Sequence, residues 1–391
     1  MFLARLLVLF SLVCISCAHS SFEQKQLKHA LDFATSNRLE LEILLQHYTY
    51  DSLKLEAAKF LIRNMPHCYS YQQGGEMDSV KRVRTYYSPF GQIDQTYARR
   101  WGHYTYRNLL KIYDAHIITA EYLIDNIDRA FDNWQKRPWN RSLSFEDFCE
   151  YLLPYRIGDE PLEEWRELYE KKYGYLLDSI YKGGDVVEAA NLVSRHLQEP
   201  VFIYCEDFEL PHIGPRYLFS HRYGSCVDAA DIVTYAFRAV GIPCMEDTDA
   251  RGGHVWNVVR DTTGRDVPIW YIASEAVRGS RDTGGYKRGK VYRPMYGFQE
   301  EKAAHLGDDW KSMPLLFYHP YMKDVSYAYY PDTLRILTGI PDDEVCYLAH
   351  FHEAHWWSCA CARSASGKME IPNLELSLIH ISEPTRLDVI S

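Results

Sequence analysis

The sequence lacks the features that a protein uses to bind nucleic acid or to cross a membrane. Its 43 Lys and Arg residues are outnumbered by 53 Asp and Glu residues, which gives a net charge of −10 at pH 7, and no basic block occurs. Because phosphates are recognised by basic stripes, nucleic acid is not an expected partner. Beyond the N-terminal segment, no stretch is long and apolar enough to span a bilayer. The 391 residues, 47% of them hydrophobic, can instead bury a sizeable core.

Signatures of metal sites and of disulfide frameworks are also weak. The ten cysteines are scattered along the chain instead of being packed into a small scaffold. Histidines and cysteines between residues 350 and 361 offer metal-type ligands, but their spacing is one residue short of the HExxH motif. Asp247 and Asp249 lack the glycine and the distal glutamate of a calcium-binding loop. We therefore expect neither a metal nor a cofactor.

The N-terminus has the composition of a targeting segment. An arginine precedes the apolar run Leu6–Ile15, which is too short to span a bilayer and predicts a signal peptide. Cleavage before Cys17, with lipid attached to its sulfur, resembles a bacterial lipoprotein signal at residues 1–17, although Cys14 stands where leucine is usual. Ordinary cleavage near residues 18–20 is the alternative. We expect membrane association through lipidated Cys17 at the outer membrane or cell surface, with the periplasm as second choice.

The apolar pattern divides the rest of the chain into successive regions. Residues 22–198 have mostly helical spacing and predict a helical N-terminal domain. Residues 199–300 contain one helix among short strand-like runs and form the predicted core. Residues 301–375 predict an incomplete β-rich module. Its strand-like runs lie at 325–330, 333–337 and 345–351. Residues 376–391 resemble the translation of a sequencing-adapter fragment, so we expect them to be non-native.

One helix and two strands of the predicted core are chemically informative. Apolar positions recur with helical spacing over residues 226–240, and Gly241 can end that helix. Strand-like runs follow at 254–259 and 267–272, and the loop 261–264 between them has hairpin character. The order is therefore one helix followed by antiparallel strands.

The cysteine at the start of this helix has the setting of a nucleophile. Free N–H groups and the dipole of a helix N-terminus stabilise a thiolate, and Cys226 stands in the first turn. Its side chain is expected to point toward the sheet, where His254 opens a strand and can accept the thiol proton. Gly252 and Gly253 permit close backbone approach beside a cleft. Cys226 and His254 are therefore the candidate nucleophile and general base.

Three motifs in this region resemble those of a known family. The segments Tyr223-Gly-Ser-Cys226-Val-Asp-Ala-Ala, Phe237-Arg-Ala-Val-Gly-Ile-Pro243 and Gly253-His-Val-Trp-Asn257 are similar in order and spacing to the transglutaminase-like superfamily. That superfamily includes animal transglutaminases, peptide N-glycanases and bacterial cysteine peptidases. The resemblance implies an α+β fold, in which a papain-like core packs a helix on an antiparallel sheet. A less specific likeness to exported bacterial relatives implies a preceding helical domain and a partial β-sandwich-like module after the core.

The resemblance also implies roles for individual residues. Cys226 would be the nucleophile and His254 the general base and later acid, and the backbone N–H of Cys226 would donate to an oxyanion. The family places an aspartate on the next strand, where this chain has no acid. Glu275 is the favoured replacement and Asp266 the alternative. If neither acid reaches the ring, Asn257 or a water could orient it, and the pair would then be weaker or the domain inactive.

The expected function is thiol-dependent acyl transfer through a thioester on Cys226. Hydrolysis of peptide or amide bonds is favoured over cross-linking, because most bacterial relatives that the resemblance implies are peptidase-like. Tyr223, Trp256 and Asn257 are expected to contact the substrate, with plain core packing as the alternative for Trp256. The substrate would be a peptide or protein, with or without an attached glycan. The alternative function is an inactive cell-surface module that binds peptide or glycan.

Overall fold

The protein is described from a computed structural model that covers most of the chain. The described residues are 21–87, 106–199, 201–204, 210–250, 253–270, 274–280, 289–300, 315–337, 339–352 and 355–375. The predicted signal peptide at 1–17 and the predicted non-native tail at 376–391 lie outside them. Within the described ranges, no helix combines the length and apolar character that crossing a membrane requires.

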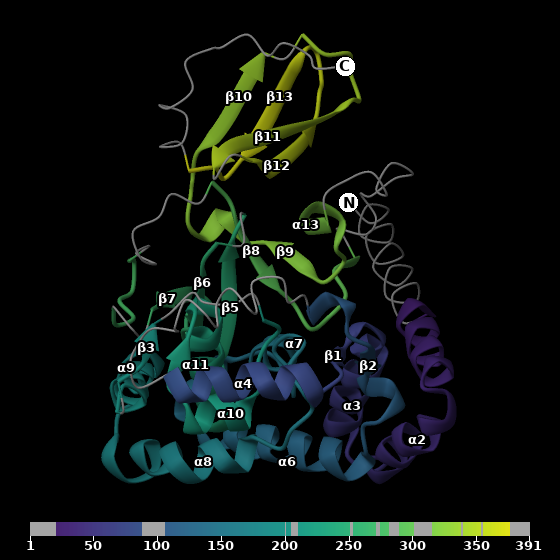
Figure 1. The fold of residues 1–391 in the computed structure, drawn as a ribbon, viewed down its shortest axis with the longest axis vertical. Helices are drawn as coiled ribbons and strands as arrows, with labels where there is room; N and C mark the ends of the chain where they lie inside the picture. The colour runs from purple at the N-terminus through teal and green to yellow at the C-terminus, as the bar shows by residue number, and fades with distance from the viewer. Residues whose placement is uncertain are drawn as a thin grey trace, which may run out of the picture.

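Helices fill the lower part of the molecule in Figure 1, below the central sheet, and a small β module lies at the opposite end. Residues 21–33 are helical. The later helices of this region are α2 (Arg38–His47), α3 (Ser52–Asn64), α4 (Gly75–Tyr87), α6 (Ala120–Lys136), α7 (Phe145–Tyr151), α8 (Arg166–Tyr175) and α9 (Val186–Leu197). Short 3-10 or π turns are η1 (Thr35–Asn37), η2 (Met65–His67), η4 (Tyr106–Asn108), η5 (Asp114–His116), η6 (Pro138–Ser142) and η7 (Leu176–Ile180). Strands β1 (Tyr69–Tyr71) and β2 (Lys111–Tyr113) pair antiparallel among them. The predicted helical character of this region is therefore confirmed.

Side-chain caps decide where several of these helices begin. The carboxylate of Asp51 accepts a hydrogen bond from the backbone N–H of Lys54 in α3, and Thr119 caps α6 in the same way. Asp185 accepts from the first turn of α9. Such caps supply partners for N–H groups that have none within the helix.

The central sheet has the strand order β7-β6-β5-β8-β9, and every neighbouring pair is antiparallel. Its strands are β5 (Cys244–Asp249), β6 (Val255–Arg260), β7 (Asp266–Ile269), β8 (Val291–Pro294) and β9 (Met322–Asp324). Beside it lie α10 (Pro215–Ser220), α11 (Cys226–Ala239) and the short parallel pair β3 (Ile203–Tyr204) and β4 (Tyr223–Gly224). The α+β class and the helix packed on an antiparallel sheet are confirmed.

The hydrophobic core does not follow the predicted region boundaries. One cluster of buried residues joins Tyr169 of α8 and Val193 of α9 to Phe237 of α11 and Trp256 of β6. Strand β9 also belongs to the central sheet, although it lies beyond residue 300. The core predicted at 199–300 therefore shares its packing with the helices before it and its sheet with the chain after it.

The C-terminal module consists of two antiparallel pairs. Strand β10 (Thr333–Leu337) pairs with β13 (Lys368–Pro372), and β11 (Val345–His352) pairs with β12 (His355–Arg363). Before them lie α13 (Leu315–Tyr318) and the 3-10 turn η9 (Ser326–Ala328). The prediction of a strand at 325–330 is therefore wrong, because residues 326–328 form a turn. The Asp324 carboxylate accepts from the backbone N–H of Ser326, whose hydroxyl bonds to the backbone of β8, and these contacts favour a turn.

Candidate functional site

Helix α11 begins at Cys226 because the residues around it form a capping box. The Ser225 hydroxyl accepts from the backbone N–H of Val227 at 3.3 Å, and the Asp228 carboxylate accepts from the N–H of Ser225 at 2.8 Å. Gly224 has φ +152, and a Cβ at that position would collide with Asp228. The buried thiol of Cys226 is thus the first side chain of the helix, as the sequence predicts.

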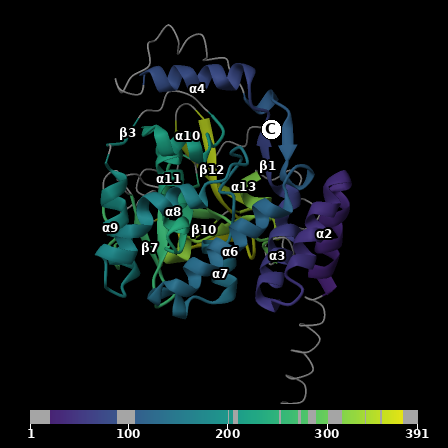
Figure 2. The ribbon, with the colours of Figure 1, turned by 90° about the horizontal axis from the view of Figure 1, so that it is seen from below.

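A helix from the N-terminal region is tied to this helix start. Arg84 of α4 donates through Nη2 to Asp228 Oδ2 at 2.8 Å and through Nη1 to Oδ1 at 3.3 Å. Both side chains are buried, and the guanidinium also lies 5.7 Å from the ring centroid of Tyr223. In Figure 2, α4 forms an outer layer on the side of the molecule where α10 and α11 lie. The ion pair therefore joins α4 to the cap of the thiol helix.

The direction of α11 brings its start to the start of β6. Arg238, near the end of α11, donates through Nε to the carbonyl of Cys244 at 3.2 Å, and Thr234 donates to Glu246 at 2.7 Å. The helix is therefore antiparallel to β5 and parallel to β6, because β5 and β6 are themselves antiparallel. Asn257 of β6 completes the contact, because its Nδ2 donates to Thr234 at 2.9 Å. Cys226 and His254 consequently precede this contact at the same end of the helix and the sheet.

The His254 ring is buried against two tryptophans. Its centroid lies 5.7 Å from the stacked ring of Trp256 and 4.5 Å from the nearly perpendicular ring of Trp270. Side chains alternate across a strand, so His254 and Trp256 share one face while Asn257 faces α11. Trp256 Nε1 also donates to the Tyr329 hydroxyl at 2.9 Å. Any contact between the His254 imidazole and the Cys226 thiol would therefore form at the end of the sheet where β6 begins.

The structure does not bring Glu275 to His254. The Glu275 carboxylate is 54% exposed and accepts from Arg195 Nη1 at 2.5 Å. Asp266 is also engaged elsewhere, 2.7 Å from Arg293 and 2.8 Å from Arg260. Burial alone would raise the pKa of Asp266, but these two guanidinium groups lower it below its usual value. Neither acid considered from the sequence is placed as the third member of the site.

The three residues predicted to contact the substrate lie in the interior. Tyr223, Trp256 and Asn257 are all buried, Trp256 Nε1 donates to the Tyr329 hydroxyl, and Asn257 Nδ2 donates to the carbonyl of Ala230. Core packing, the alternative for Trp256, therefore describes all three in this structure. A substrate at Cys226 would need contacts from other side chains.

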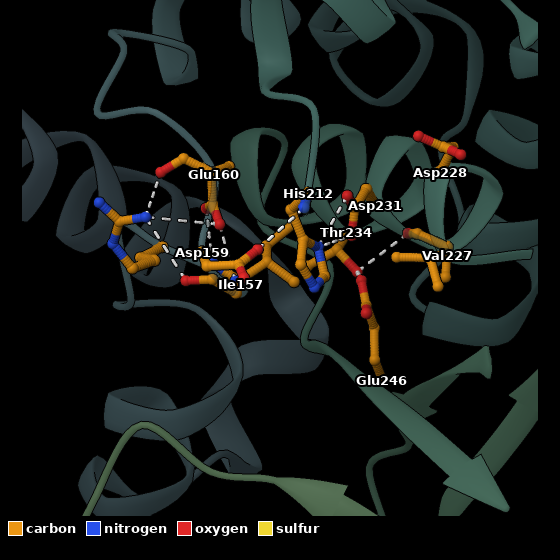
Figure 3. A network of polar contacts seen from close by, with 12 residues as sticks. Ile157, Asp159, Glu160, His212, Val227, Asp228, Asp231, Thr234 and Glu246 are labelled. Carbon is orange, nitrogen blue, oxygen red and sulfur yellow. Dashed lines mark hydrogen bonds and ion pairs between the residues drawn. The ribbon is translucent and has the colours of Figure 1, made fainter. Parts of the chain in front are cut away.

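Sequence reasoning missed an acid–base pair between half-buried His212, which precedes α10, and buried Asp231 of α11. His212 Nδ1 lies 2.9 Å from both carboxylate oxygens of Asp231. Figure 3 shows the ring between residues 157–160 and α11, directed toward Asp231. Burial opposes a charge on the ring, but the Asp231 carboxylate outweighs it and holds the pKa of His212 well above its usual value. The one signal in the sequence was an acid within a largely apolar helix.

Two glutamates in the same network have opposite pKa shifts. Burial, reinforced by the negative charge of Asp231, raises the pKa of Glu246 to about 8. Burial would also raise the pKa of Glu160, but the Arg156 guanidinium, His212 and two backbone N–H groups lower it. The network in Figure 3 therefore disfavours charge on one glutamate and favours it on the other.

A cavity of about 820 Å³ adjoins this network. Its lining includes His212, Glu246 and Val227, the residue that follows Cys226. Trp356 and Trp357 of β12 also contribute to its wall. The cavity therefore lies next to the first turn of α11 and reaches the C-terminal β module.

Comparison of the chain with protein-family models, curated proteins and solved structures gives no match. The transglutaminase-like resemblance and the papain-like core thus remain predictions from the three motifs. Within the described part of the chain, no group of three or more His, Cys, Asp or Glu side chains is arranged to hold a metal ion.

Proposed function

We propose that the protein is a thiol-dependent acyl-transfer enzyme that hydrolyses peptide or amide bonds. The observation that supports it is the position of Cys226 as the first residue of a capped helix that runs along the strand opened by His254. The N–H groups and dipole of the helix start favour a thiolate. The histidine at the same end of the sheet is a candidate acceptor for the thiol proton.

In the proposed reaction, the Cys226 thiolate attacks the amide carbonyl and the backbone N–H of Cys226 donates to the oxyanion. The protonated His254 then gives its proton to the leaving amine, and a thioester forms. His254 next removes a proton from water, which attacks the thioester and releases the acid. Since Glu275 and Asp266 are engaged elsewhere, we propose that packing against Trp256 orients the ring.

Alkylation of the thiol with iodoacetamide across pH tests the proposed pair. We expect Cys226 to react with an apparent pKa below the ~8.5 of a free cysteine. His254→Ala should move that pKa toward ~8.5, and Cys226→Ala should abolish rapid labelling. Burial raises the pKa of both Cys68 and Cys244 to about 12, so these thiols provide slow internal controls in the peptide map. Ordinary thiol behaviour of Cys226, or rapid labelling that survives its replacement, would contradict the proposal.

A second function is favoured by the cavity beside α11. The protein would then be a catalytically inactive module that holds a peptide or glycan at the cell surface. The interior positions of Tyr223, Trp256 and Asn257 support this alternative, because the side chains expected to contact a substrate at the thiol are buried. Ordinary alkylation of Cys226 together with ligand binding that does not require it would favour this function over the enzyme.

For either function we propose export and anchoring through lipid on Cys17. The apolar run before it is too short to span a bilayer, whereas two acyl chains suffice for stable attachment. Metabolic labelling with a radioactive fatty acid tests this directly. We expect Cys17→Ala to lose the label and to appear in the soluble fraction, and a labelled variant would contradict the anchor.

A further inference from the structure

The cavity beside α11 has the size and position of a ligand site. Its volume of about 820 Å³ falls within the roughly 300–1,000 Å³ that is usual for small-molecule sites, which often lie between domains. The lining comes from the helical region, the central sheet and the C-terminal module. The lining includes residues 67–69, 156–159, 212, 227, 238, 245–250, 294–296, 321–322 and 356–358.

Two polar groups at the cavity wall have unused bonding capacity. Glu246 is 7% exposed, and its Oε1 accepts from Thr234, whereas its Oε2 has no hydrogen-bond partner among the described residues. His212 uses Nδ1 for Asp231, and its Nε2 likewise has none among them. Both groups line the cavity and would be satisfied by a polar ligand there.

Aromatic surfaces form another part of the wall. Trp356 is 71% exposed and Trp357 is 42% exposed, although large apolar side chains are normally buried. Near them, Tyr321 and His67 stack with centroids 3.6 Å apart and an interplanar angle of 17°. Exposed apolar surface beside a groove is typical of a binding site. Flat rings of this kind can pack against the C–H faces of a sugar ring.

The charged side chains that line the cavity are of both signs, with Arg156 and Arg238 on one side of the balance and Asp159, Asp247 and Asp249 on the other. Asp231 faces His212, and Asp247 lies 2.6 Å from Arg293 in a fully buried pair. Burial also raises the pKa of Glu246, which disfavours the charged form of this side chain. An ammonium or carboxylate ligand would therefore gain little from these groups, whereas a neutral hydroxyl can both donate and accept.

We infer that this cavity binds a neutral saccharide, whose hydroxyls bond to Glu246 Oε2 and His212 Nε2 while a tryptophan of β12 packs on a sugar ring. This inference rests on the binding function proposed above and names its ligand class. It is independent of whether Cys226 is catalytic, because none of these contacts involves the thiol.

Titration of the full chain with defined probes tests the inference. Cys226→Ala protein is titrated by calorimetry with neutral di- and trisaccharides of glucose, galactose, mannose and N-acetylglucosamine. Chitosan disaccharide, digalacturonic acid and a blocked neutral tetrapeptide serve as cationic, anionic and peptide probes. We expect at least one neutral saccharide to bind at least tenfold more tightly than all three other probes.

Variants then assign the contacts. Glu246→Ala and the double variant Trp356→Ala/Trp357→Ala should each weaken saccharide binding at least tenfold. Glu246→Gln should retain most of the affinity, because its amide can still donate and accept. Tyr175→Ala removes an aromatic ring that is 50% exposed and lies outside the cavity lining, and it should leave binding unchanged. Unaltered circular dichroism and urea midpoints establish that each variant is folded.

The possible failures are distinguishable. Binding of the tetrapeptide without any saccharide would overturn the ligand class and leave the proposed binding function standing. Binding of no probe would contradict both. Saccharide binding that survives both Glu246→Ala and the tryptophan double variant would place the ligand elsewhere and overturn the site.

Discussion

Replacing Arg84 with alanine should destabilise the protein by about 3–5 kcal/mol, the usual cost of removing one partner from a buried ion pair. The Arg84 side chain is 2% exposed and bonds through two nitrogens to Asp228, which is also buried. The variant would leave this carboxylate without its counter-charge at the start of α11. It would also remove a cation from beside the ring of Tyr223.

Other replacements around the same helix start should give graded effects. Ser225→Ala removes the cap alone and should cost about 0.5–2 kcal/mol. Asp228→Ala removes the ion pair and the reciprocal half of the capping box, and it also leaves the Arg84 charge buried, so it should cost the most. The matched control is Arg195→Ala, which breaks an ion pair between exposed side chains and should cost about 0–1 kcal/mol.

Urea unfolding followed by tryptophan fluorescence measures the series, with free energies from linear extrapolation. The order expected is Asp228→Ala, Arg84→Ala, Ser225→Ala and Arg195→Ala, from largest loss to smallest. Equal shifts for Arg84→Ala and Arg195→Ala would refute the reasoning, because they would mean that burial of the ion pair has no energetic consequence.

Three further outcomes are expected. The pKa of Glu246 is about 4.5 in the unfolded chain and about 8 in the folded protein, so between these pH values the folded state binds more protons and the free energy of unfolding should fall as pH rises. Glu246→Gln should flatten this part of a profile of urea midpoint against pH, and an unchanged slope would contradict the shift. Gly241→Ala should lower the free energy of unfolding, measured by thermal unfolding, by about 1–3 kcal/mol more than Gly264→Ala does. Both glycines have positive φ, but only at Gly241 would a Cβ lie 2.8 Å from other atoms. Equal losses of stability would count against the clash. Glu275→Ala should leave the alkylation profile of Cys226 unchanged, because its carboxylate bonds to Arg195, and a raised thiol pKa would instead restore Glu275 to the site.

Local signals in the sequence predicted the elements around the thiol well. The start of α11 at Cys226 follows from the adjacent cap, and β6, β7 and β10 begin within one residue of the predicted runs. Gly241 has φ +82 just after the helix, as expected of a residue that ends one. Each of these features depends on neighbouring residues, so the sequence alone contains the information.

Features created by distant contacts could not be predicted in this way. His212 meets Asp231 because the chain before α10 returns to the side of α11. Trp256 is fixed by Tyr329, which lies 73 residues further along the chain. The Glu275 carboxylate accepts a hydrogen bond from Arg195 of α9 and does not contact Cys226 or His254. No local pattern marks any of these pairs, since each depends on how separate segments pack.

The place of β9 at the edge of the central sheet has a consequence for synthesis of the chain. Strands β5, β6 and β7 are complete at residue 269, whereas β8 and β9 follow only at 291–294 and 322–324. At roughly 5–20 residues per second, the ribosome needs several seconds to add them. During that time one side of the nascent sheet exposes unpaired backbone groups, which can pair with another chain. Translation pauses between β7 and β9 should therefore favour aggregation, even though the segment that carries Cys226 and His254 has already emerged.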